Sequence, residues 1–110
     1  MASQFELTRN ASGQFHFALR AANGEKLLSS ETYNSKAGAL DGIDSVRSHC
    51  VSDANYQKKT ATNGQPYFVL VAANRETIGT SETYSSSAAM EVGIASVKQN
   101  APTAPVDDRT

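Results

Sequence analysis

The chain of 110 residues contains one segment twice, and this internal repeat constrains its fold more than any other feature. When the sequence is aligned with itself at a shift of 51 positions, Gly13 meets Gly64 (64 − 13 = 51), and the alignment continues without a gap. The tetrapeptide Ser-Glu-Thr-Tyr stands at 30–33 and again at 81–84. Such a duplication gives both halves the same local structure, and we expect a pseudo-twofold relation between them.

Apolar and polar side chains alternate at the start of each copy. In the first copy Phe15, Phe17 and Leu19 recur at every second position, which is the pattern of a strand with one buried face. Phe5 and Leu7 show the same alternation before a turn that ends at residue 13. We therefore expect two paired strands, followed by a third, in each copy.

A hairpin turn is predicted where Asn23-Gly24 follows the second strand. Both residue types tolerate the positive φ angles that a type I′ turn requires. The second copy has Asn74-Arg75 at this place. Because arginine tolerates positive φ poorly, we expect a turn of another type in the second copy.

The spacing of apolar residues changes to that of a helix after residue 35. Ala39, Ile43, Val46 and Cys50 recur three or four positions apart, so that they share one helix face. Glycine stands in the middle of both expected helices, where it costs about 1 kcal/mol relative to alanine. Its presence at the same place in both copies indicates that the helix approaches the sheet closely.

The predicted unit is β-β-β-α, with a further strand after each helix. Three strands and one helix bury little core, so we expect the two copies to share one antiparallel sheet with both helices on one face. The fold class is α+β with pseudo-twofold symmetry. We expect one domain over 1–110, with the first copy at about 3–53 and the second at about 54–108. The tail 101–110 contains two prolines and is either frayed or an edge strand around Val106.

The second copy carries three segments that resemble a known family: 63–70 (NGQPYFVL), 78–86 (IGTSETYSS) and 92–98 (VGIASVK). They are similar to the YegP-like family of small uncharacterised bacterial proteins, some with one copy of the unit and some with two. The resemblance extends from about Phe5 to Val106. It implies the fold described above, with the last strands of the units, 54–60 and roughly 104–108, exchanged between the halves. It implies no activity, so no catalytic residues are carried over.

Composition argues against several classes of function. Ten basic and eleven acidic residues give a net charge of −1, without the basic excess of most nucleic-acid-binding proteins. No apolar run approaches the roughly 20 residues that span a membrane. One cysteine cannot form an internal disulfide, and the first residues lack the layout of a secretory signal. We expect a cytoplasmic protein that does not bind membranes. Weak nucleic-acid binding is a third functional option, and the composition argues against it.

The residues most often used in metal sites and nucleophilic catalysis are few in this chain. His16 and His49 are replaced by Tyr67 and Asn100 in the second copy, so the duplication repeats no imidazole. Cys50 continues the apolar face of the first helix, which favours a buried thiol over a nucleophile. We expect no metal, no cofactor and no catalytic residue.

The leading functional hypothesis is a non-enzymatic binding or scaffold module that acts through the face of the sheet away from the helices. In the second copy this face is expected to present Gln65, Tyr67, Val69 and Val71. An apolar face of this kind is a candidate partner surface, although strand pairing inside the monomer would equally bury it. A duplicated chain completes its own sheet, so we expect a monomer, with weak dimerisation through open sheet edges as the alternative.

The duplicated Ser-Glu-Thr-Tyr segments carry the alternative hypothesis. Glu31, Tyr33, Glu82 and Tyr84 would form a site for a small polar ligand or for hydrolysis if they converged. The plainer interpretation is that threonine and tyrosine pack against the start of the helix while the glutamates cap nearby backbone N–H groups.

Overall fold

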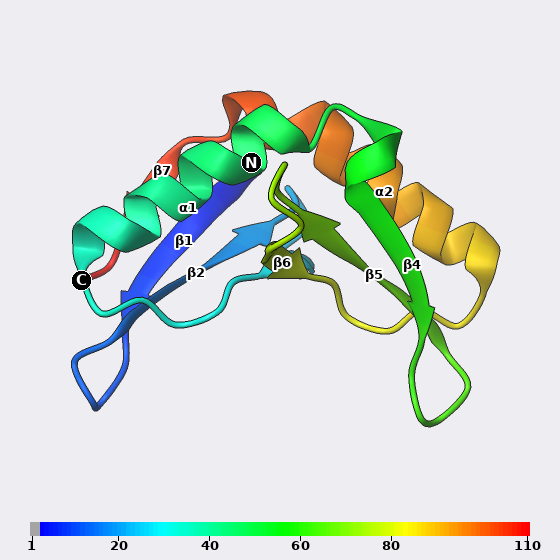
Figure 1. Ribbon diagram of the computed structural model, residues 1–110, viewed down its shortest axis with the longest axis horizontal. Coiled ribbons are helices and arrows are strands. Elements are labelled where there is room, and N and C mark those ends of the chain that lie inside the picture. The colour runs from blue at the N-terminus through cyan, green and yellow to red at the C-terminus, as the bar shows by residue number, and fades with distance from the viewer. Residues whose placement is uncertain (1–2) are drawn as a thin grey trace.

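Seven strands form one sheet, and two helices cover one face of it (Figure 1). The computed structural model describes residues 3–110. The strands are β1 (Gln4–Arg9), β2 (Phe15–Arg20), β3 (Lys26–Ser29), β4 (Tyr56–Thr60), β5 (Pro66–Val71), β6 (Thr77–Thr80) and β7 (Val106–Asp108), and the helices are α1 (Lys36–His49) and α2 (Ser87–Asn100). Short 3₁₀ turns, Asp53–Asn55 and Ala101–Thr103, follow the helices. The predicted α+β class and the twofold β-β-β-α order are confirmed.

The two copies meet in the middle of the sheet. The strand order is β4-β5-β6-β3-β2-β1-β7, and β3 pairs with β6 through Ser29 and Thr80. Six strands pair in the expected antiparallel manner, whereas β7 lies parallel to β1. The turn after α2 contacts α1, and the chain then enters the sheet beside the start of β1, where the Phe5 N–H donates to the Pro105 carbonyl at 2.8 Å. It can therefore run only in the direction of β1.

The strand that follows each helix lies in the opposite half of the sheet. β4 follows α1 but pairs with β5, and β7 follows α2 but pairs with β1. This is the exchange that the family resemblance implied. Of the two alternatives for the tail, the edge strand is the correct one, because Val106–Asp108 is paired.

Each helix begins at a serine and buries the predicted face. The Ser35 and Ser86 hydroxyls accept hydrogen bonds from backbone N–H groups three residues later, at 3.0 and 3.1 Å, which satisfies donors that a helix start leaves unpaired. Between the sheet and the helices lies one core. Its largest fully buried side chains are Phe5, Phe17, Phe68, Leu7, Leu19, Leu28, Ile43 and Leu70.

The turns between the second and third strands correct two predictions. Gly24 has φ +86°, whereas Asn23 is not at positive φ, so the turn is not of type I′. The Gly24 N–H donates to the Ala21 carbonyl at 2.9 Å, as in a three-residue loop that ends on a left-handed residue. The second copy has the same turn, because Arg75 takes φ +72°. The arginine accepts the strained backbone, since the paired strands on both sides fix the loop.

Replacing Arg75 by glycine is expected to stabilise the protein by about 0.5–1 kcal/mol. A non-glycine residue in the left-handed region costs about 1–2 kcal/mol, and glycine removes this cost. Glycine also loses more conformational entropy on folding, which offsets about 0.5–1 kcal/mol of the stabilisation. Urea unfolding of the Arg75→Gly variant measures the difference. The reverse change, Gly24→Ala, is the matched control and should destabilise the protein, although no atom lies within 4 Å of the added Cβ. Equal stability of both variants and the parent would contradict this account of the turn.

Candidate functional site

The serine of each Ser-Glu-Thr-Tyr segment completes the edge of a strand. The Ser30 hydroxyl accepts a hydrogen bond from the Phe17 N–H at 2.9 Å and donates to the Glu31 carbonyl at 2.7 Å. Ser81 makes the same pair of bonds, at 3.0 Å to the Phe68 N–H and 2.8 Å to the Glu82 carbonyl. The identity of these serines therefore has a structural cause: each replaces a backbone partner where the third strand leaves the second.

The tyrosine of each segment lies against the glycine in the middle of its helix. The Tyr33 ring stacks on Phe17, with ring centroids 6.2 Å apart and an angle of 15° between the planes, and Tyr84 stacks in the same way on the second copy's phenylalanine. A Cβ at Gly42 or Gly93 would overlap the hydroxyl oxygen of the tyrosine. The expected close approach of helix and sheet is thus made through a tyrosine ring between them.

The two Ser-Glu-Thr-Tyr segments follow β3 and β6, which pair in the middle of the sheet. β3 and β6 are antiparallel and pair at Ser29 and Thr80, so the segments that follow them leave the middle of the sheet in opposite directions. Packing of the tyrosines agrees with the plainer interpretation, and Glu82 lies 3.9 Å from Lys26 of the other copy.

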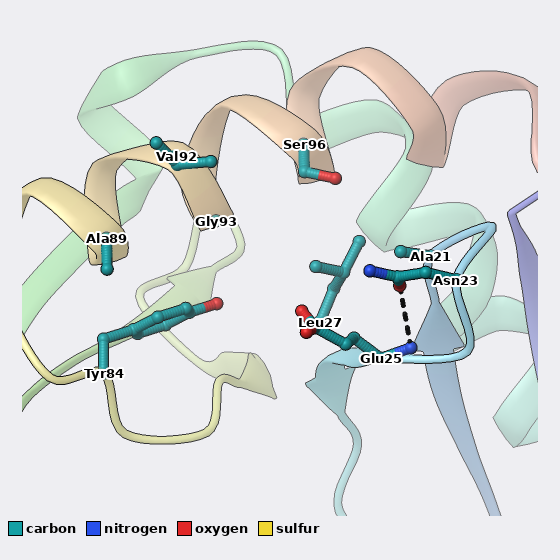
Figure 2. Close-up of a pocket in the computed structure, with 9 residues that line it drawn as sticks. All are labelled: Ala21, Asn23, Glu25, Leu27, Tyr84, Ala89, Val92, Gly93 and Ser96. Atoms are coloured by element: carbon teal, nitrogen blue, oxygen red, sulfur yellow. Dashed lines mark hydrogen bonds between the residues drawn. The ribbon is translucent and has the colours of Figure 1, made fainter.

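Glu82 and Tyr84 do, however, border a cavity that both copies build (Figure 2). Its larger part has a volume of about 550 Å³ and lies between the β2–β3 turn and α2. A second hollow of about 330 Å³ shares Glu25, Tyr84 and Ala89 with it and extends to Glu82. The larger part is lined by Ala21, Asn23, Glu25, Leu27, Tyr84, Ala89, Val92, Gly93 and Ser96.

The cavity combines an apolar wall with two polar groups that are free to bind. Leu27 and Val92 supply apolar surface, and Val92 is 70% exposed. The Glu25 carboxylate points toward the Tyr84 hydroxyl from the opposite side (Figure 2). Within residues 3–110, neither the Glu25 carboxylate nor the Tyr84 hydroxyl has a hydrogen-bond partner or an ion pair. Such an arrangement suits a ligand that is apolar at one end and a hydrogen-bond donor at the other.

The local environment keeps Tyr84 neutral. Burial raises the pKa of Tyr84 above its ordinary value of 10.0, and the negative charges of Glu25 and Glu82 raise the pKa further. The phenol therefore stays protonated at physiological pH, where it can both donate and accept one hydrogen bond. Burial also raises the pKa of Tyr33, with Glu31 as the nearby charge.

The predicted apolar sheet face is not exposed. Val69 is 6% and Val71 2% exposed, while Gln65 and Tyr67 are half-buried. Val69 lies between paired residues on two neighbouring strands, and cross-strand neighbours about 4.5–5.5 Å apart cover much of a short side chain. The register of β5 shifts just before Val71. Strand pairing inside the monomer, the other alternative drawn from the sequence, accounts for these two valines.

The histidines and the cysteine lie in separate surroundings. The His16 ring contacts the Thr8 hydroxyl at 2.9 Å, and the His49 ring contacts the Ser45 carbonyl at 2.8 Å. Cys50 is buried, as predicted, and burial raises the pKa of its thiol. Within residues 3–110, no three His, Cys, Asp or Glu side chains gather in a way that could hold a metal ion. In the same part of the chain, neither helix has the length and apolar character needed to cross a membrane.

Most residues of the cavity could not be found from one copy alone. Glu25 and Leu27 belong to the first copy, whereas Val92 and Ser96 belong to the second, and only the assembled sheet brings them together. One signal was available in the sequence. Val92 is the counterpart of Asp41, and an apolar residue at an exposed helical position that is acidic in the other copy marks a difference between the two helix faces.

Comparison with known proteins places the chain in a family. Residues 10–57 and 61–108 each match the family model described as a domain of unknown function (DUF1508). The UPF0339 protein YegP of Shigella flexneri is 50% identical over 110 residues, which is the whole of both chains. A UPF0339 protein of Shewanella oneidensis is 46% identical, also over the whole of both chains.

Two solved structures have the same fold. The solution NMR structure of YegP from Escherichia coli, titled a protein of unknown function, gives a TM-score of 0.93 at 49% identity and covers 100% of this chain and 95% of that chain. The NMR structure of the Shewanella oneidensis protein gives 0.91 at 46% identity, covering 98% and 92%. The chain therefore belongs to the UPF0339 family of YegP-like proteins and carries the DUF1508 domain twice.

Proposed function

We propose that this protein is a binding module that holds a cationic group, carried on an apolar stem, in the cavity between the β2–β3 turn and α2. The observation that carries the proposal is the unpaired Glu25 carboxylate, which points into an apolar-lined cavity toward a neutral phenol. Neighbouring Lys26 is turned to Glu82 at 3.9 Å, so it does not neutralise Glu25.

An alkylammonium group matches this cavity in both polarity and shape. Its three N–H donors can bond to the Glu25 carboxylate and the Tyr84 oxygen, and because Glu25 is exposed its ion pair with the ammonium contributes up to about 1 kcal/mol. Its methylene stem can lie on Leu27 and Val92, at about 0.8 kcal/mol for each CH₂ group that becomes buried. A lysine side chain of a partner peptide and a free alkyl diamine share this chemistry.

The hydrolytic alternative has less support. It requires Glu31, Tyr33, Glu82 and Tyr84 to act on one substrate, and the first two line neither part of the cavity. Binding through the sheet face also has less support, because its valines are buried. A function of holding rather than converting a ligand needs only the carboxylate, the phenol and the apolar wall.

The test is a titration followed by the backbone amide signals in NMR spectra. The probes are Nα-acetyl-lysine methylamide and 1,4-diaminobutane, each compared with a neutral analogue, Nα-acetyl-norleucine methylamide and 1-butanol. We expect saturable shifts around residues 23–27, 84 and 89–96 with the amines and weaker shifts with the neutral compounds. Stronger binding of the lysine derivative would point to a peptide ligand, and stronger binding of the diamine to a small molecule.

The duplication supplies a matched control variant. Glu25→Gln is expected to weaken amine binding about two- to fivefold, because Glu25 is exposed and an exposed ion pair contributes up to about 1 kcal/mol, where about 1.4 kcal/mol makes a tenfold step. Glu76→Gln changes the counterpart in the second copy, which does not line the cavity, and should leave the affinity unchanged. Equal affinity of both variants, or no saturable shift in the parent, would sink the proposal.

A further inference from the structure

The outer edges of the two halves of the sheet differ. β1 is covered on its outer side by the parallel strand β7, whereas its counterpart β4 is the last strand at the other end of the sheet. Figure 1 shows β7 and β4 on opposite flanks of the molecule. In the first half, the outer edge of this unit binds a parallel strand. Within residues 3–110, no strand lies along the corresponding outer edge of β4 in the second half.

The backbone of β4 repeats the edge that binds β7. Phe5 pairs with Leu19 and Tyr56 pairs with Leu70, each pair related by the shift of 51, so the two edge strands have the same register against their neighbours. On β1 the Leu7 carbonyl faces outward and accepts a hydrogen bond from the N–H of residue 109 at 2.8 Å. By the same alternation, the N–H and C=O of Lys58, the counterpart of Leu7, face outward from β4.

The side chains of β4 favour an acidic strand. On β1, Leu7 lies beside Asp108 of β7. Carried to β4, the same register places a carboxylate beside Lys58, whose side chain is 55% exposed. The Lys58 ammonium pairs with Glu91 of α2 at 2.6 Å, so a carboxylate of the added strand would share this ammonium with Glu91. In the first half Asp108 pairs with Lys36 at the start of α1, but the counterpart of that lysine in α2 is Ser87, which has no charge. In the second half, the cation available to the carboxylate of an added strand is therefore Lys58 on the strand itself, whereas in the first half it is a lysine on the helix.

The same charges argue against a second copy of this chain as the occupant. Two β4 edges paired with each other would bring the lysines of both strands together, and lysine at an exposed edge is a common protection against such pairing. A β7 strand from another molecule would have to leave its own β1, where Arg47 also holds the Ala104 carbonyl at 2.7 Å. A separate acidic segment meets neither obstacle.

We propose that the outer edge of β4 binds an extended acidic segment of a partner protein, which joins the sheet as a strand parallel to β4. The backbone of the segment pairs with the outward N–H and C=O of Lys58, and a carboxylate of the segment lies beside the Lys58 ammonium. Addition of a strand to an open sheet edge is a common mode of peptide recognition, in which main-chain bonds give affinity and side chains give selectivity.

A synthetic peptide that copies residues 104–110, acetyl-Ala-Pro-Val-Asp-Asp-Arg-Thr-amide, tests the proposal against the full-length protein. We expect saturable shifts of the amide signals of residues 56–60 and 66–71, with a dissociation constant below about 1 mM. Lys58→Glu should weaken binding at least tenfold, and raising the salt concentration should weaken binding to the parent, because both charges are exposed.

Two N-methylated peptides separate strand pairing from simple charge attraction. In a parallel ladder the N–H groups of alternate residues face the partner strand, and the first aspartate of the peptide is one of these. N-methylation of the first aspartate should abolish binding, whereas N-methylation of the second, whose N–H faces away, should leave it within about threefold. Equal behaviour of the two peptides, shifts confined to β1 and β7, absence of binding, or pairing of β4 with a second copy would each overturn the proposal.

Discussion

Phe17→Ala is expected to lower the free energy of unfolding by about 3–5 kcal/mol, the usual cost of emptying a phenylalanine site in a core. Phe17 is fully buried, and its ring contacts both the neighbouring strand β1 and the tyrosine that lies against α1. Its ring meets Phe5 of β1 edge to face at 5.9 Å and stacks on Tyr33 at 6.2 Å. The loss would also free the tyrosine that keeps α1 at its distance from the sheet. Since small domains are stable by about 5–15 kcal/mol, this one change removes a large part of the total.

Urea unfolding at 25 °C, followed by far-ultraviolet circular dichroism, measures the effect of Phe17→Ala. Val51→Ala is the control, because Val51 is 63% exposed and its truncation should stay within about 0.5 kcal/mol. The same experiment on Phe68→Ala tests the pseudo-twofold relation, since Phe68 makes the corresponding contacts to Tyr56 and Tyr84. A cost below about 1 kcal/mol for Phe17→Ala would mean that the aromatic cluster does not hold the half together.

The features that could be predicted from the sequence are those that depend on short stretches of chain. Alternation around Phe17 and helical spacing from Ala39 to Cys50 report which side chains are buried, and burial follows from local geometry once the element type is known. The repeat then gave the assembly, because one copy alone cannot bury its core. The exchange of strands came from the family resemblance and not from residue spacing.

The features that could not be predicted depend on how the halves meet. The cavity is lined by Glu25 of one copy and Tyr84 of the other, and no spacing of residues within one copy predicts that these two side chains lie near each other. The burial of Val69 depends on which strands flank β5, which the alternation pattern does not report. The prediction of a different turn at Arg75 was wrong for a related reason. The strands on both sides impose the left-handed conformation, and the residue type only sets the free-energy cost of that conformation.

The glycines of α1 differ in what an added methyl group would meet, and this difference gives the second large effect. At Gly42 a Cβ would overlap the Tyr33 hydroxyl oxygen and lie 2.9 Å from Cε2 of the fully buried Phe17. At Gly38 the nearest atom is the Ser35 hydroxyl oxygen at 3.2 Å, and the second copy already carries alanine at this place, with its capping bond intact. Packing alone therefore distinguishes two substitutions that have the same helix propensity.

Gly42→Ala is expected to lower the free energy of unfolding by up to about 2 kcal/mol, because overpacking costs about 1–3 kcal/mol and the better helix propensity of alanine offsets roughly 1 kcal/mol of this. Gly38→Ala should raise the free energy of unfolding by up to about 1 kcal/mol, so the two variants should differ by about 1–3 kcal/mol in urea unfolding. Tyr33→Phe removes the overlapping oxygen and should recover part of the loss when combined with Gly42→Ala, which appears as a coupling energy in a double-mutant cycle. If Gly42→Ala were as stable as Gly38→Ala, the tyrosine would be free to move aside, and the repeated glycine would need another explanation than the ring that lies against it.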